Sequence, residues 1–401
     1  MPRFFCPPML SLARYADLLD DRDLRRTVTA SVIGRLPIGV TGLSILLLAQ
    51  GGTGSFAQGG IMAAAYVIGL ACVAPWMGRV IDRSGPRSVL RICAIAFPSA
   101  LIALVLAIEL QAPRPLAWLF AFAAGAGFPP ITVCMRTLFR QKLGDNPLLS
   151  AAYSLESVLI ELIFIVGPIL VAVLIAIASP PIPVLFAAAC GTAGTWLFLR
   201  SPALRRWHIE ARTPTGLLGP LAAPKFLLLL SIVFGYAGAF GLIEIGVAGY
   251  ASSIGHPALT GVLLSLMSVG SALGGLAYGS RNWRPPLPRQ FALTLALIGV
   301  GMGSLAVAAN PWLFAGLGFV AGLVMAPALT IQSMLVARIA IQTHSAEAFT
   351  WSSTGLLSGV GLGMAAGGWI IERWGWSWTF GLACVAALGA SIAALALRLR
   401  D

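Results

Sequence analysis

Residues 78–87 read GRVIDRSGPR, a polar stretch with one glycine at its start and another near its end. Uniformly apolar sequence flanks it, over roughly residues 56–77 and 89–110. Glycine allows tight turns and close approach of helices, and an aspartate such as Asp82 is stabilised at the positive end of a helix. The stretch therefore predicts a short charged loop between two membrane-spanning helices.

The composition of the whole chain also indicates a membrane protein. Of its 401 residues, 58% are hydrophobic and only 10% are charged, with a mean hydropathy of +0.90; soluble domains carry about 25% charged residues. A helix needs about 20 apolar residues to cross the hydrocarbon core, and long uniform apolar runs favour helices over barrel strands. We therefore predict an all-α integral membrane protein with twelve transmembrane helices. The predicted spans are residues 27–49, 56–77, 89–110, 116–138, 149–176, 184–200, 226–250, 259–279, 290–309, 312–337, 347–370 and 377–397.

The net charge of +12 is distributed as in a membrane protein. With the N-terminus in the cytoplasm, only Arg35, Arg114 and Arg373 of the 26 basic residues fall outside the cytoplasmic segments. This is the positive-inside pattern, and it predicts that both termini are cytoplasmic. The sequence offers no basic face for nucleic acid. The excess of arginine over lysine favours a bacterial cytoplasmic (inner) membrane.

The chain divides into two halves. A break rich in proline and arginine at residues 201–225 separates them, and glycines recur at an offset of 201 residues. The matched glycines are Gly60 and Gly261, Gly69 and Gly270, and Gly78 and Gly279. We predict two pseudo-symmetric six-helix bundles, at 27–200 and 226–401, joined by a cytoplasmic linker at 201–225 and preceded by a cytoplasmic arm at 1–26.

Two local patterns lead to further expectations. Residues 11–26 form an amphipathic helix, which we expect to lie at the inner membrane surface. Gly359, Gly363 and Gly367 form a double GxxxG pattern, which predicts close packing against another helix. That packing is either static or a seam at which the two halves rock.

The stretch G-x-x-x-D-R-x-G-x-R between spans 2 and 3 resembles the loop signature of the major facilitator superfamily, whose two halves are parallel six-helix repeats. Gly167-Pro168 in span 5 partly resembles the antiporter signature of the same superfamily. The resemblance implies a monomeric solute carrier that works by alternating access. It also implies that the loop holds the two halves together as a conformational latch, with Asp82 against the start of span 11, near Ser345–Glu347, and Arg140 as a further partner. The latch residues are Gly78, Asp82, Arg83, Gly85 and Arg87.

Four charged residues fall inside the predicted spans, away from the span ends. They are Arg35, Glu156, Glu161 and Glu244. A charge in hydrocarbon costs at least about 2.5–3.5 kcal/mol and persists mainly beside a cavity or a partner. Glu161 is the first candidate for a proton carrier, followed by Glu156 and Glu244. The alternative for each is a structural ion pair, such as Glu156 with Arg35 or Arg136.

The spans expected to line a central cavity carry few polar groups. The substrate-cavity candidates are Arg35, Arg136, Thr132, Tyr236, Gln332 and Ser333. A sugar needs many hydrogen-bonding partners because each unpaired hydroxyl is costly. The sequence therefore favours a small amphipathic or lipophilic substrate.

We expect a proton-coupled exporter, an antiporter, that contacts a small-molecule substrate, protons and the lipid bilayer. The alternatives are an importer or facilitator of a metabolite or organic anion held by Arg35 and Arg136, a lipid translocator, and a membrane sensor without transport. No Walker loop, HExxH, CxxC or G-x-S-x-G motif is present. We accordingly expect no catalytic residue, no metal site, no cofactor and no enzymatic activity.

Overall fold

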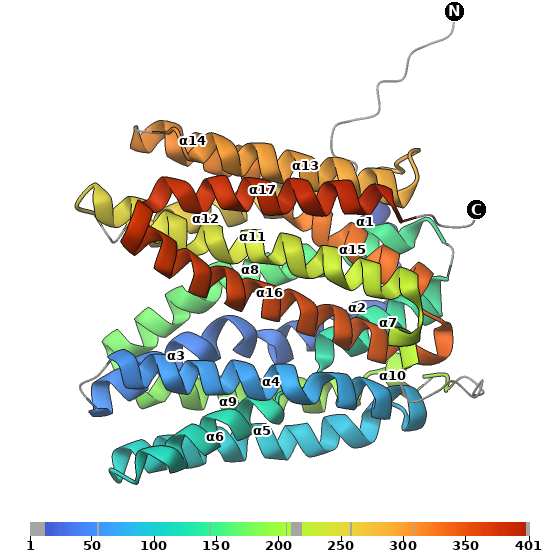
Figure 1. The fold of residues 1–401 in the computed structure, drawn as a ribbon. Coiled ribbons are helices and arrows are strands. Elements are labelled where there is room, and N and C mark those ends of the chain that lie inside the picture. The colour runs from blue at the N-terminus through green and yellow to red at the C-terminus, as the bar shows by residue number, and fades with distance from the viewer. Residues whose placement is uncertain are drawn as a thin grey trace, which may run out of the picture.

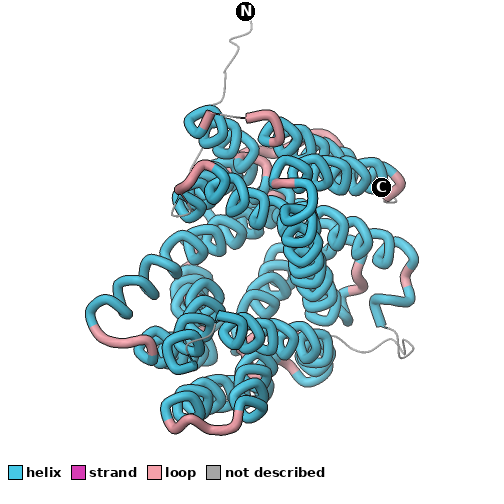
Figure 2. Tube along the Cα trace, turned by 60° about the vertical axis from the view of Figure 1, so that its left-hand side comes forward, coloured by secondary structure: helices cyan, strands magenta, loops and turns pink. Residues whose placement is uncertain are grey.

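The computed structural model describes residues 13–53, 56–144, 146–205, 207–209, 219–256, 259–308 and 310–397, and these are helical almost throughout (Figures 1 and 2). The helices of the first half are α1 Ala13–Asp20, α2 Arg22–Arg35, α3 Pro37–Thr53, α4 Phe56–Ser84, α5 Pro86–Glu109, α6 Arg114–Ala126, α7 Ile131–Leu143, α8 Leu148–Ile177 and α9 Pro181–Leu199. After the short α10 Pro202–Arg205 and η1 Gly219–Ala222 come α11 Pro224–Ser253, α12 Leu259–Gly279, α13 Leu287–Leu305, α14 Pro311–Gly322, α15 Met325–Ile339, η2 Gln342–His344, α16 Ser345–Trp374 and α17 Trp376–Leu395.

The predicted membrane fold is confirmed. In the described residues, eleven helical stretches are long and apolar enough to span a membrane, with α2–α3, α6–α7 and α14–α15 each forming one stretch. Helix α13 occupies the place of the predicted span at 290–309, but Arg289 and Gln290 in its first turn lower its hydropathy. The twelve predicted spans thus correspond to these eleven stretches and α13.

Three predicted spans are not continuous helices. The first breaks between α2 and α3 at Pro37, the fourth at Pro129-Pro130 between α6 and α7, and the tenth between α14 and α15. Proline lacks a backbone N–H and its ring clashes with the preceding helical turn, which accounts for the first two breaks. Each break lies within the bundle, where neighbouring helices can satisfy the freed backbone groups.

The helices form two groups, which contact each other through a small number of helix pairs. In Figure 1, α4, α5, α6 and α9 lie on one side and α13, α14 and α17 on the other. Contacts between the groups are made mainly by α4 with α16 and by α8 with α12 and α15. The division into bundles at 27–200 and 226–401 stays a prediction, and much of the predicted linker, residues 206 and 210–218, lies outside the described residues.

The apolar face of helix α1 packs on protein, and the expectation that the amphipathic segment lies at the membrane surface stays a prediction. Tyr15 and Leu18, on its apolar face, are buried. The Tyr15 hydroxyl lies 2.9 Å from the carbonyl oxygen of Leu276 and 3.2 Å from Oγ of Ser154, and Arg14 donates to the carbonyl of Gly279 at 3.1 Å. Helix α1 therefore bridges α8 and α12. Residues 1–12 lie outside the described part of the chain.

The double GxxxG of α16 packs against α11, within the same group of helices. A Cβ on Gly359 would lie 2.8 Å from Cβ of Ala237, and one on Gly363 would lie 2.9 Å from the carbonyl carbon of Gly238. Contact with another helix was predicted correctly, but the rocking-seam interpretation of these two glycines is wrong. Helix α16 meets α4 through other residues.

We expect Gly363→Ala to destabilise the protein, because the added methyl would clash with the backbone of α11 and overpacking costs about 1–3 kcal/mol. The matched control is Gly361→Ala on the same helix, where a Cβ meets no atom within 4 Å. Apparent melting temperatures in detergent should fall for Gly363→Ala and not for Gly361→Ala. Equal values for the two variants would contradict this packing.

Candidate functional site

The loop at 78–87 joins two helices by a tight turn. Gly85 has a φ of 79° and precedes Pro86, the first residue of α5. This left-handed conformation favours glycine, and proline is well suited to the first turn of a helix. We call this end of the bundle, on the right in Figure 1, the loop end.

Asp82 caps the N-terminus of α16. Its Oδ1 accepts a hydrogen bond from the Ala346 N–H at 2.8 Å, and its Oδ2 accepts one from the Glu347 N–H at 2.7 Å. A carboxylate at this position satisfies two N–H groups that have no partner within the helix and also interacts favourably with the helix dipole. The sequence placed Asp82 at this helix start; its role as a latch stays a prediction.

Other charged contacts also join the first group of helices to the start of α16. Arg79 Nη2 lies 2.6 Å from Oε1 of Glu347, whose side chain is only 1% exposed. Arg140, the further partner suggested by the sequence, donates to the Ala340 carbonyl at 2.6 Å and to Ser345 Oγ at 3.2 Å. Sequence reasoning missed the Arg79–Glu347 pair, although Arg79 lies one helical turn before Asp82 and so shares its face.

The remaining predicted latch residues differ in their surroundings. Gly78 lies against α16, and a Cβ there would sit 2.8 Å from the Ala346 carbonyl oxygen. Arg83 and Arg87 are exposed. The structure thus brings Gly78 and Asp82 to the crossing of α4 and α16, while Arg83 and Arg87 face outward from it.

A cluster of buried charges lies between α2, α7 and α8. Arg35, the last residue of α2, forms an ion pair with Oε1 of Glu156 on α8, and each side chain is only 1% exposed. Arg35 also donates from Nε to the Ser31 carbonyl at 3.1 Å and from Nη2 to Ser31 Oγ. The alternative that Glu156 forms a buried ion pair fits this geometry. Its proton-carrying role remains untested.

Arg136 lies beside this ion pair on α7. It is 8% exposed, and its charge interacts with both Arg35 and Glu156. The structure shows no hydrogen-bond partner for Arg136 Nε or for Glu156 Oε2. Two arginines and one glutamate therefore share this interior, which leaves an excess positive charge of one.

Candidates from the second half form a hydrogen-bonded chain. Tyr236 on α11 hydrogen-bonds to Oε1 of Gln332 on α15, and Gln332 Nε2 donates to Ser352 Oγ at 2.7 Å. The Tyr236 hydroxyl is close enough to Arg136 for charge interaction across the two groups of helices. Ser333 instead donates to the Leu329 carbonyl of its own helix at 2.9 Å, and Thr132 is half-buried.

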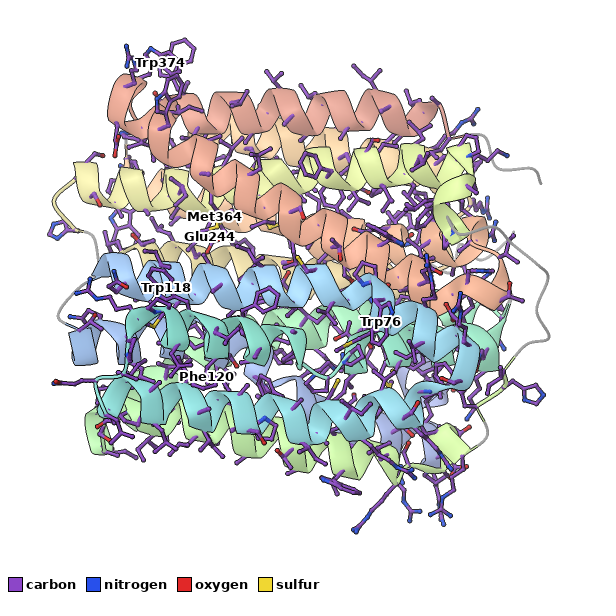
Figure 3. All side chains as sticks on the ribbon, turned by 60° about the horizontal axis from the view of Figure 1, so that its bottom comes forward. Trp76, Trp118, Phe120, Glu244, Met364 and Trp374 are labelled. Carbon is purple, nitrogen blue, oxygen red and sulfur yellow. The ribbon has the colours of Figure 1, made fainter. Side chains whose placement is uncertain are left out.

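Glu161 lies where α8 meets α12. Its Oε1 accepts a hydrogen bond from Ser271 Oγ at 2.8 Å, and Ser271 Oγ in turn accepts one from the Ala326 N–H at 2.9 Å. Glu244, the third glutamate candidate, is exposed on α11 and lies near Met364 in Figure 3. The structure therefore separates the three glutamates into an ion pair, an interhelical hydrogen bond and an exposed position.

Residues 28–287 and 247–401 match the family model described as Major Facilitator Superfamily. No curated protein sequence matches the chain. Among solved structures, a bacterial homologue of the iron transporter ferroportin in an outward-facing state is similar, with a TM-score of 0.76, 14% identity, and coverage of 93% of this chain and 98% of that one. The human organic anion transporter MFSD10 (TETRAN) has a TM-score of 0.72 and 20% identity, over 92% and 99%. FucP in the outward conformation has a TM-score of 0.68 and 12% identity, with coverage of 94% of this chain and 99% of that one.

We expect Asp82→Asn to loosen the loop end, because an amide has one acceptor atom where the carboxylate has two and carries no charge. A hydrogen bond to a charged group is worth about 1.5–3 kcal/mol. Spin labels at the exposed Ser84 and Ile341, with the native cysteines replaced, should report a longer or broader distance distribution in the variant.

The control for this measurement is Asp17→Asn, which makes the same change on the exposed face of α1. It should leave the label distances unchanged. An unaltered distribution in Asp82→Asn would show that the cap does not hold α4 against α16.

Proposed function

Because the chain belongs to the major facilitator superfamily, a family of multi-pass membrane transporters that bind small solutes and often couple to protons, we propose that it is a proton-coupled antiporter. It exports a small amphipathic compound from the cytoplasm. The observation that carries this proposal is the position of Glu161, a carboxyl group on the seam between the two groups of helices.

The hydrogen bonds around Glu161 give a route from protonation to movement. Ser271 Oγ accepts the Ala326 N–H, so its own hydrogen is directed to Glu161. A hydroxyl donor stabilises an ionised carboxylate. If α8 and α12 separate, Glu161 loses that donor and the neutral form becomes relatively more favourable. Proton uptake would then accompany opening of the seam, which is a coupling that every proton-driven transporter requires.

Several contacts between the two groups of helices gather at the loop end. Asp82, Arg79 and Arg140 hold α4 and α7 to the start of α16 there, and α1 bridges α8 and α12. In our proposal this end faces the cytoplasm of a bacterial cell, both termini are cytoplasmic, and the two bundles of a monomer rock about the centre. The arrangement then corresponds to a state closed to the cytoplasm.

The interior supports an amphipathic substrate better than a sugar. Around the central charges lie aromatic side chains, with Tyr236 and Phe291 at 5.9 Å and Tyr153 and Phe349 at 6.1 Å between ring centroids. In the second half, Tyr236, Gln332 and Ser352 are already paired with one another. A solute with many hydroxyl groups would leave some of them without partners.

We expect Glu161→Gln to reduce proton-coupled transport tenfold or more while solute binding persists, because glutamine can accept the Ser271 hydrogen bond but cannot exchange a proton. The measurement is acidification or alkalinisation inside reconstituted vesicles, followed by a pH-sensitive dye. The solute panel comprises lipophilic cations, amphipathic anions and sugars.

The matched control is Glu109→Gln, at an exposed glutamate that ends α5. It should transport like the unaltered protein. Full proton-coupled transport by Glu161→Gln would assign Glu161 a structural role and move the proton site to another carboxyl group.

A further inference from the structure

The buried guanidinium of Arg136 has unused hydrogen-bonding capacity. Its side chain is 8% exposed, Nε lies out of reach of solvent, and no hydrogen bond or ion pair of this side chain occurs in the described part of the chain. A buried ionised group without a partner is among the least favourable arrangements in a protein interior. Its position therefore points to a partner that arrives from outside the chain.

The surrounding charges define what that partner carries. The titratable groups facing Arg136 are Arg35, Glu156, Tyr153 and Tyr236. Arg35 is satisfied by Glu156 and Ser31, so the ion pair is neutral as a unit. The positive charge left over is that of Arg136. One negative charge on a ligand would balance it, whereas a cation would add to it.

We propose that the substrate of the transporter is a monoanionic amphipathic compound whose anionic group binds Arg136. The inference rests on the proposed function and names its substrate class. A guanidinium presents a planar fork of N–H donors that matches a carboxylate or a similar oxyanion. The same chemistry is offered by the head of an anionic lipid, which the experiment below separates from a soluble anion.

Both groups of helices contribute to this site. Arg136 belongs to α7 of the first, whereas Tyr236 of α11 and Phe349 of α16 belong to the second. Phe349 packs edge to face against Tyr153, whose hydroxyl donates to the Arg136 carbonyl at 3.3 Å. An anion held by Arg136 would therefore bind beside residues of both groups. Binding at such a place can favour one arrangement of the halves over the other.

The test is binding of three matched probes to the full chain in detergent, measured by titration calorimetry. The probes are 2-naphthoate, the neutral 2-naphthylmethanol and the cationic 2-naphthylmethylammonium. We expect 2-naphthoate to bind at least tenfold more tightly than the other two, because charge-assisted hydrogen bonds are the stronger class. Equal binding of the alcohol and the anion would overturn the proposal.

Substitution locates the site. Arg136→Gln should remove the preference for 2-naphthoate, while Arg338→Gln, the same change at an exposed arginine of α15, should retain it. If Arg136→Gln does not fold, Arg136→Lys carries the test, since lysine lacks the planar fork and should bind 2-naphthoate several-fold more weakly. An unchanged preference in Arg136→Gln, or in Arg136→Lys where that variant carries the test, would overturn the assignment.

Two further measurements separate this inference from the proposed function. Flotation with vesicles containing phosphatidylglycerol, compared in wild type and Arg136→Gln, tests whether the bound anion is a lipid headgroup. If Arg136 binds this lipid but not 2-naphthoate, the soluble-anion proposal is overturned. In the vesicle transport assay, Arg136-dependent binding of 2-naphthoate without proton movement for any solute would support the anion site and contradict the antiporter. Proton movement evoked only by cations would support a proton-coupled antiporter and contradict the anion site.

Discussion

The structure depends on one constraint: an ionised side chain in the interior of this bundle is costly unless it meets another polar group. Water is scarce there, and the cost of an unpaired charge is several times the worth of an ordinary contact. The Arg35–Glu156 pair, the Asp82 cap on α16 and the Ser271–Glu161 hydrogen bond all satisfy it across helices that are distant in sequence. The arrangement of the two groups of helices follows from where these pairs form.

The loop stretch was the most predictive part of the sequence. Its spacing and charges resemble the loop signature of the family, and that resemblance implied that Asp82 lies at the start of α16. The contact could be anticipated because a carboxylate and a helix N-terminus are complementary whatever surrounds them. The Arg79–Glu347 pair could not, since long charged side chains can reach several partners and only the packing of α4 on α16 selects one.

Proline shows why the spans themselves were harder to define. Pro75, Pro98 and Pro168 lie inside the continuous helices α4, α5 and α8, whereas Pro37 and the pair at 129–130 coincide with breaks. Hydropathy is blind to the difference, because a membrane helix tolerates proline when its neighbours satisfy the freed carbonyl.

The glycines of α16 raise a similar difficulty. Their spacing predicts close contact with a helix but says nothing about which helix, and the partner is α11 of the same group. The central site was predicted in the same partial way. Arg35 and Glu156 were identified as charges inside the spans and Arg136 as a cavity candidate, but only the three-dimensional arrangement shows which two of them pair.

The bridge made by α1 has a consequence for how the protein is made. Arg14 contacts Gly279, which lies 265 residues further along the chain. At a synthesis rate of about 5–20 residues per second, the ribosome needs on the order of 15–50 s to produce that stretch. During this interval the amphipathic segment has no α12 to bind, and its apolar face has to be sheltered by lipid or by a chaperone. Docking of α1 thus waits until α12 has been made, and the contacts of α13 to α17 become available only after it.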